Sequence, residues 1–296
     1  MAQHNIENYP SSGEETYDQG EATTTSKLQN LIFKVITGLF VLFLLVAFNL
    51  VFLLIVISWL PDAAWLAILS DPGDPADLSH RLHNSILPVT TWFVLIGTVV
   101  QLYRPQDRLA PLLMALAVPV IFALVELATG TYTVMGTGPF LFPLVLIALL
   151  HPRARELVRV RQLDGVMAGL TGLAAVAWFS FAYGQVQLQR FASPGDSHAE
   201  MEHWNLMAVL AILIIVWGLI GASDRPGWRL VAWVAGLASA WYGFQSLLFP
   251  AASAASLPWA VAAIIWAVVY VIVAERRARS AALTGTEGAA PMTSGR

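Results

Sequence analysis

Four of the six histidines lie in two short polar segments that are about 120 residues apart. Residues 77–84 read Asp-Leu-Ser-His-Arg-Leu-His-Asn, and residues 196–204 read Asp-Ser-His-Ala-Glu-Met-Glu-His-Trp. Imidazole and carboxylate groups are ligands of transition metals, and they are also common acids and bases in enzyme catalysis. The two segments therefore form the candidate functional site of the chain.

The spacing within each segment favours metal binding on helices. His80 and His83 are three residues apart, and so are Glu200 and His203. Residues at this spacing share one face of an α-helix. Facing helices that carry Glu-x-x-His pairs build metal sites in helical bundles. His198 is a further ligand candidate in the second segment.

The sequence around these segments is that of a membrane protein. Hydrophobic residues make up 57% of the 296 residues and charged residues only 12%, whereas soluble domains are about 25% charged. There is no cysteine, which excludes disulfides, thiolate ligands, iron–sulfur clusters and c-type haem attachment. A metal or haem would therefore need His, carboxylate or Met ligands.

Apolar runs of about 20 residues recur along the chain, and each is long enough to cross the hydrocarbon core as a helix. They predict an all-α fold, a polytopic membrane helical bundle with about eight transmembrane helices. The predicted spans are 35–60, 85–103, 109–129, 135–151, 163–187, 204–222, 229–249 and 257–274.

Two groups of matching residues indicate an internal repeat of four spans plus four. Arg104-Pro105 recurs as Arg225-Pro226, and His83 recurs as His203, both at an offset of about 120 residues. The predicted organisation is a disordered acidic tail at 1–28, a first four-helix repeat at 29–161, a second at 162–280 and a disordered tail at 281–296. Because each repeat has an even number of spans, the two repeats have the same orientation and are related by an axis along the membrane normal.

The distribution of basic residues predicts the orientation. With the N-terminus in the cytoplasm, all of the 16 Lys and Arg residues except Arg81 and Arg190 lie on the inner side, as the positive-inside rule requires. Both termini are then cytoplasmic, and the protein belongs to the cell (inner) membrane. The simplest interpretation of the arginine cluster 153–161 is a topology determinant, and the second is a binding site for anionic lipid heads. His151, at the inner boundary, receives no role.

In this orientation the polar groups collect at the outer surface. Glu126 and Gln245 lie near the outer ends of spans three and seven, level with the two histidine segments. A carboxylate within a span is costly, by about 2.5–3.5 kcal/mol at the bilayer centre. Trp204 falls where an interfacial aromatic belt is expected. The predicted metal ligands are His80, His83, Glu126, His198, Glu200 and His203.

This ligand set suits zinc, iron, copper or manganese. Alternatively, His83 and His203 would ligate one b-type haem. The corresponding function is that of a membrane oxidoreductase or a metal-dependent hydrolase acting at the outer face.

Three other interpretations stay open. The histidines and glutamates are explained equally by polar helix starts and helix capping. A permease or ion carrier would use Glu126, with Asn49 and Gln245, along its pathway. A non-catalytic subunit of a membrane complex would need nothing from the histidines. The expected partners are membrane lipids and another copy of the chain or a membrane complex, and the net charge of −3 argues against nucleic acid.

Overall fold

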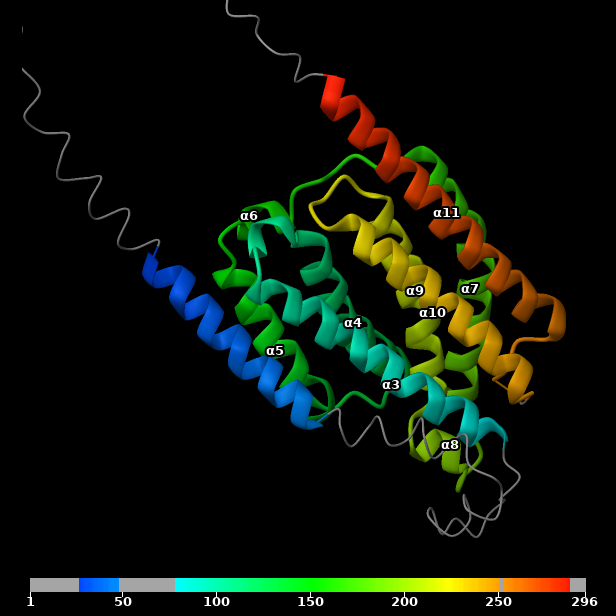
Figure 1. Cartoon of the computed structure of the whole chain (residues 1–296). Coiled ribbons are helices and arrows are strands. Elements are labelled where there is room, and N and C mark those ends of the chain that lie inside the picture. Colours follow the sequence, from blue (N-terminus) through cyan, green and yellow to red (C-terminus); the bar gives the residue numbers. More distant parts are fainter. Residues whose placement is uncertain (1–26, 48–77, 251–252, 288–296) are drawn as a thin grey trace, which may run out of the picture.

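The computed structural model describes residues 27–47, 78–250 and 253–287 (Figure 1). These residues form helices, without a strand among them, and the predicted all-α class is confirmed. Leu163 and Ser223 make one isolated antiparallel bridge. The elements are an N-terminal helix Lys27–Ala47, followed by α3 (Leu78–Val99), η1 (Val100–Leu102), η2 (Pro105–Asp107), α4 (Leu109–Thr129), α5 (Val134–Leu150), α6 (Ala154–Leu157), α7 (Gly165–Arg190), α8 (Ser197–Glu200), α9 (His203–Ala222), α10 (Trp228–Leu248) and α11 (Leu257–Glu287).

Six of the described helices are long and apolar enough to cross a membrane, which makes the chain a multi-pass membrane protein by helix length and composition. They are Lys27–Ala47, His80–Leu102, Leu109–Thr129, Gly165–Arg190, His203–Ala222 and Leu257–Ala281. The predicted fourth span is the 17-residue helix α5. The predicted seventh span is α10, whose 21 residues include Arg229, Ser239 and Gln245. The count of eight and the four-plus-four repeat stay predictions.

Some predicted boundaries shift, and others lie outside the described residues. α11 continues to Glu287, past the predicted end of the second repeat at residue 280. Residues 48–60 of the first predicted span and most of both predicted tails lie outside the described ranges.

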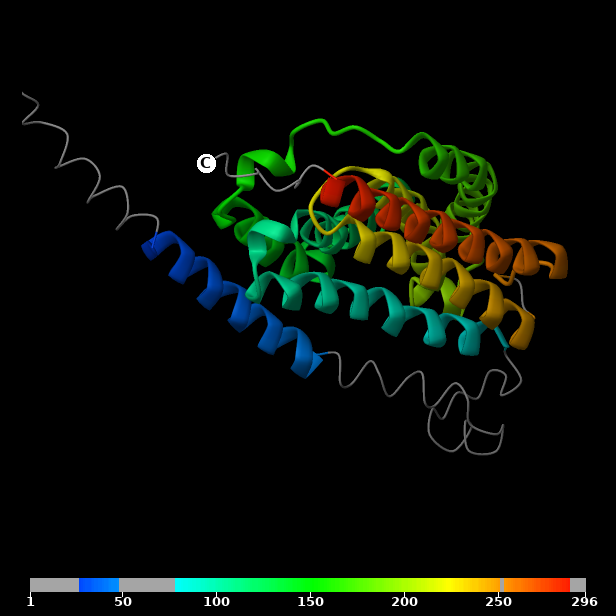
Figure 2. The ribbon, with the colours of Figure 1, turned by 45° about the horizontal axis from the view of Figure 1, so that its top comes forward.

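Helix α9 lies at the centre of the bundle and packs against α7, α10, α4 and α3 (Figure 1). A helix that is hydrophobic on all sides is expected in such a position. Two glycines permit its close packing. A Cβ on Gly218 would lie 2.8 Å from Thr171 Oγ1 on α7, and one on Gly221 would lie 2.9 Å from the Cα of Ala232 on α10. The N-terminal helix, in contrast, lies at the periphery in both orientations of the molecule (Figure 2).

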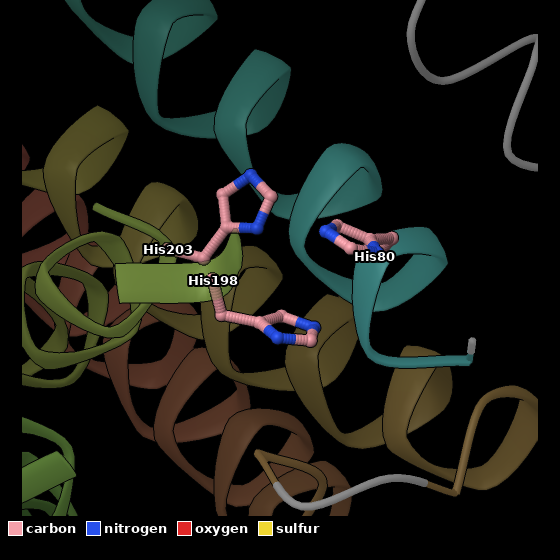
Figure 3. A group of neighbouring side chains, drawn as sticks. All are labelled: His80, His198 and His203. Carbon is pink, nitrogen blue, oxygen red and sulfur yellow. The ribbon is translucent and has the colours of Figure 1, made fainter. Parts of the chain in front are cut away.

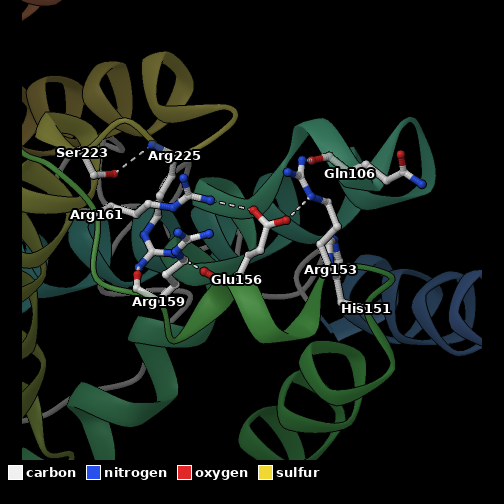
Figure 4. Close-up of polar contacts among 8 residues, drawn as sticks. All are labelled: Gln106, His151, Arg153, Glu156, Arg159, Arg161, Ser223 and Arg225. Atoms are coloured by element: carbon white, nitrogen blue, oxygen red, sulfur yellow. Dashed lines mark hydrogen bonds and ion pairs between the residues drawn. The ribbon is translucent and has the colours of Figure 1, made fainter.

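Polar contacts join α6 to the turn between α9 and α10 (Figure 4). The Glu156 carboxylate accepts hydrogen bonds from Arg153 and Arg161, each at 2.6 Å. Arg225 donates to the backbone oxygens of Glu156 and Arg159, both at 2.7 Å. We call this part of the molecule the arginine end, defined by Arg153, Arg155, Arg159, Arg161 and Arg225.

His151 has a clear structural role there, which the sequence did not indicate. Its ring is buried and packs edge-on against Phe33 of the N-terminal helix, with 5.4 Å between the centroids. Nδ1 accepts from the Arg153 amide at 3.0 Å, so Nε2 carries the proton and donates to the Pro105 oxygen at 3.1 Å. Burial lowers the pKa of His151, and the neutral ring connects the N-terminal helix to the loop before α4 and to α5.

This arrangement predicts a pH-dependent stability. Because the pKa of His151 is lowered in the folded state, the unfolded chain takes up a proton at this ring at a higher pH than the folded protein does. Its contribution is complete above about pH 6.5 and is lost as the pH falls below that value, by at most about 1.4 kcal/mol for each pH unit. In melting experiments between pH 7.5 and 5, His151→Gln is expected to weaken the dependence of the melting temperature on pH. An unchanged slope would contradict the assignment.

Candidate metal centre

Four histidine rings meet at the other end of α3 and α9. His80 and His83 come from α3, His198 from α8, and His203 is the first residue of α9. The His80 ring is stacked on His198 with 4.2 Å between the centroids. The His83 ring lies 4.7 Å from His203 and 5.5 Å from His198. The two polar segments predicted to face each other are therefore in contact.

Three of these histidines form a group that could hold a metal ion. One ring nitrogen from each of His80, His198 and His203 lies within 4.8 Å of the corresponding nitrogens of the other two. Figure 3 shows the His80 ring on α3 facing the rings of His198, from α8, and His203, from the start of α9. His80 is buried and His198 is half-buried, so the group lies at the edge of the packed interior.

The first pair is positioned by the start of α3. Because the helix begins at Leu78, His80 and His83 lie one turn apart on the same face, as their spacing predicted. The exposed fractions are 8% for His80 and 0% for His83. Both rings therefore point into the bundle and contact the second segment.

A break in the helix positions the second pair. In one continuous helix, His198 and His203 would point about 140° apart. Glu202 instead adopts a left-handed backbone with φ of 56° and separates α8 from α9. Asp196 begins α8 by accepting from the amides of His198 and Ala199. The break directs both histidines toward α3.

Asp196 also lies close to the imidazole of His198. Its Oδ1 lies 3.5 Å from Nδ1 of that ring. Carboxylates that engage one ring nitrogen commonly fix the tautomer of a metal-binding histidine.

His83 differs from the other three histidines in its surroundings. Its Nε2 hydrogen-bonds Ser253 Oγ at 2.8 Å, and Tyr242 holds the same serine through its backbone oxygen at 3.0 Å. Its Nδ1 is buried without a hydrogen-bond partner among the described residues. The Trp204 ring is buried and packs 5.4 Å from His83 and 5.0 Å from His198. Ser253 was missed because a lone serine in an apolar loop carries no sequence signal.

The structure does not bring the predicted carboxylates into the histidine group. Glu200 is the last residue of α8, so it does not share a helix with His203. Its side chain is exposed. Glu126 is buried, and its Oε2 accepts from Thr137 Oγ1 on α5 at 2.5 Å. Gln245 is fully buried, and neither polar atom of its side chain has a partner among the described residues. The group of close ligand atoms is thus made of imidazole nitrogens alone.

No protein-family model matches the chain, and neither the curated proteins nor the solved structures contain a match to it. The class of the protein, a multi-pass helical membrane protein with a histidine cluster, therefore rests on its own residues.

The left-handed residue between α8 and α9 gives a test of how the cluster is formed. A non-glycine residue in this conformation costs about 1–2 kcal/mol, and β-branched residues fit it worst. Glu202→Val is therefore expected to lower the free energy of unfolding by about 1 kcal/mol or more relative to Glu202→Gly. Thermal melting of the two variants measures the difference. Equal stabilities would show that this backbone conformation is not needed.

Proposed function

We propose that this protein is a membrane metalloprotein that holds one transition-metal ion through His80, His198 and His203. The observation that carries the proposal is the mutual approach of their ring nitrogens within 4.8 Å. Three protein ligands leave a coordination position for water or substrate, as in catalytic zinc sites, whereas structural sites take four protein ligands. The ion belongs at the outer surface if the arginine end faces the cytoplasm of the cell membrane, as the positive-inside rule predicts.

The distances fit this role after a small contraction. Nitrogens bound at about 2 Å to one tetrahedral ion lie about 3.4 Å apart, so the rings need to close by little more than 1 Å. Because the His80 and His198 rings are stacked and ring lone pairs lie in the ring plane, binding also requires one of the two rings to rotate toward the ion. An all-imidazole set suits zinc, copper or iron better than manganese, which prefers oxygen ligands.

A single ion fits the cluster better than a b-type haem. The centroids of the His83 and His203 rings are only 4.7 Å apart. Two imidazoles bound to opposite faces of one iron need about 6 Å between their centroids, because each metal–nitrogen bond is about 2 Å. His80 and His198 fill the remaining space around this pair with direct ring contacts.

A bound ion would activate water or exchange electrons, depending on its identity. Zinc corresponds to a hydrolase, and copper or iron to an oxidoreductase. The chain's own residues set up the site. Asp196 lies close to His198, and the Ser253 hydroxyl holds His83 beside the three proposed ligands. Trp204 packs against the rings of His83 and His198.

The carrier alternative has weaker support. Glu126, its main residue, accepts a hydrogen bond from Thr137. Asn49 lies outside the described residues and does not bear on the comparison.

Metal analysis tests the proposal directly. Purified protein supplied with zinc or copper is expected to bind about one ion for each chain. Replacing His80, His198 or His203 by Ala is expected to weaken binding more than about 100-fold, because removal of an outer-shell group alone costs 10- to 100-fold. Elemental analysis and competition with a chelating dye measure both quantities.

His151→Gln is the matched control, since it removes a buried histidine at the arginine end and is expected to leave metal binding unchanged. His83→Gln tests whether His83 positions the ligands and is not itself one of them. The expected loss of metal affinity is about 10- to 100-fold, smaller than for the three proposed ligands. Absence of metal binding in the wild-type protein, or equal binding by all variants, would refute the proposal.

A further inference from the structure

A groove of about 440 Å³ runs between α4 and α9 and ends at the arginine end. Aliphatic side chains from the two helices form its walls, and the side chains of Arg161, Ser223 and Arg225 line its polar end. In the ribbon view, the linker from α6 to α7 passes over this end of the bundle (Figure 1). The aliphatic lining includes Leu113, Leu116, Val120, Val216, Leu219 and Ile220.

The polar end of the groove carries an excess of positive charge. The Glu156 carboxylate is shared by Arg153 and Arg161, so one negative charge serves two guanidinium groups. Arg225 donates to the backbone oxygens of Glu156 and Arg159, which carry no charge. The nearby carboxylates of Asp224 and Glu156 offset the positive charge around Arg225 only in part. Burial, and then the nearby charge of Arg161, lower the pKa of Arg225. An anion placed here would relieve this repulsion.

Arg161 is suited to contact such an anion. Its side chain is 21% exposed, and its Nε is buried without a partner among the described residues. A guanidinium group presents several donors in one plane and matches the oxygens of a phosphate. One edge of Arg161 is held by Glu156 at 2.6 Å, and the rest of the group remains for a second oxyanion.

We propose that this groove binds an anionic phospholipid, with an acyl chain against α4 and α9 and the phosphate beside Arg161 and Arg225. Both helices are long and apolar enough to span a membrane, so the groove lies at the depth of acyl chains and its arginines at the depth of head groups. Basic pockets between transmembrane helices are suited to anionic lipids. A free phosphate would gain nothing from the aliphatic walls. This site is separate from the histidine cluster, because the two lie at opposite ends of α9.

Lipid binding to the detergent-purified full-length protein tests the proposal. The probes are phosphatidylglycerol, phosphatidylcholine with the same acyl chains, and inorganic phosphate. Phosphatidylglycerol is expected to raise the melting temperature and to be retained in native mass spectra. Phosphatidylcholine is expected to bind at least about fivefold more weakly than phosphatidylglycerol, since one arginine near a membrane surface contributes about that factor. Equal binding of the two lipids, or the full shift with inorganic phosphate alone, would overturn the proposal.

Two variants locate the site. Arg161→Gln is expected to weaken phosphatidylglycerol binding about fivefold. Arg155→Gln is the matched control, because Arg155 is exposed, is not part of the groove and carries the same charge. Equal losses in both variants would show a general surface effect and refute the site. Ala117→Phe tests the aliphatic wall without changing any charge, by filling the groove from α4. It is expected to reduce lipid binding while the lipid-free melting temperature stays the same, and unchanged binding would refute the acyl-chain position.

Discussion

The structure depends on the enclosure of α9. Hydrocarbon offers no hydrogen-bond partners, so a membrane helix must satisfy its backbone internally and bring its polar groups to its ends. From Leu206 to Ala222, α9 carries only apolar side chains and glycine, and most of it is buried by its neighbours. Where the backbone ladder ends, Arg277 donates to the Ala222 oxygen at 3.0 Å and to the Ser223 oxygen at 3.1 Å. The Ala222 oxygen also accepts from the Asp164 amide at 2.8 Å, so two segments outside α9 satisfy carbonyls at its C-terminal end.

Because α9 is central, segments that are distant in sequence meet at each of its ends. His80 and His83 reach its first residue from α3, and Ser253 reaches the same cluster from the loop before α11. At the other end, Arg225 connects the turn after α9 to α6. A metal held by His80 and His203 would join two helices through their ligands, so that metal binding and helix packing would be coupled.

The sequence predicted those features that follow from local patterns. The apolar run 109–129 coincides with α4, and Gly130 ends it in a left-handed conformation. The i, i+3 spacing placed His80 and His83 on one face. The break at Glu202 was not predictable, since a glutamate carries no signal for a positive φ. The partners of His83 and Glu126 were missed because local sequence patterns do not show which segments meet in the fold. Ser253 lies 170 residues from His83, and the choice of Thr137 by Glu126 depends on how α5 packs on α4.

The apolar interior also bears on which function is compatible with the fold. Carriers that alternate access bind their solute near the middle of the bilayer, on polar side chains or on unwound backbone. Between Asn205 and Ser223, the central helix is unbroken and has no polar side chain that could bind a solute. The indole N–H of Trp217 already donates to the Met114 oxygen at 3.1 Å. Among the described residues, the histidine cluster lies at one end of α9 and the arginine end at the other. Such a separation favours a protein that acts at a membrane surface over one that moves a solute through the bundle.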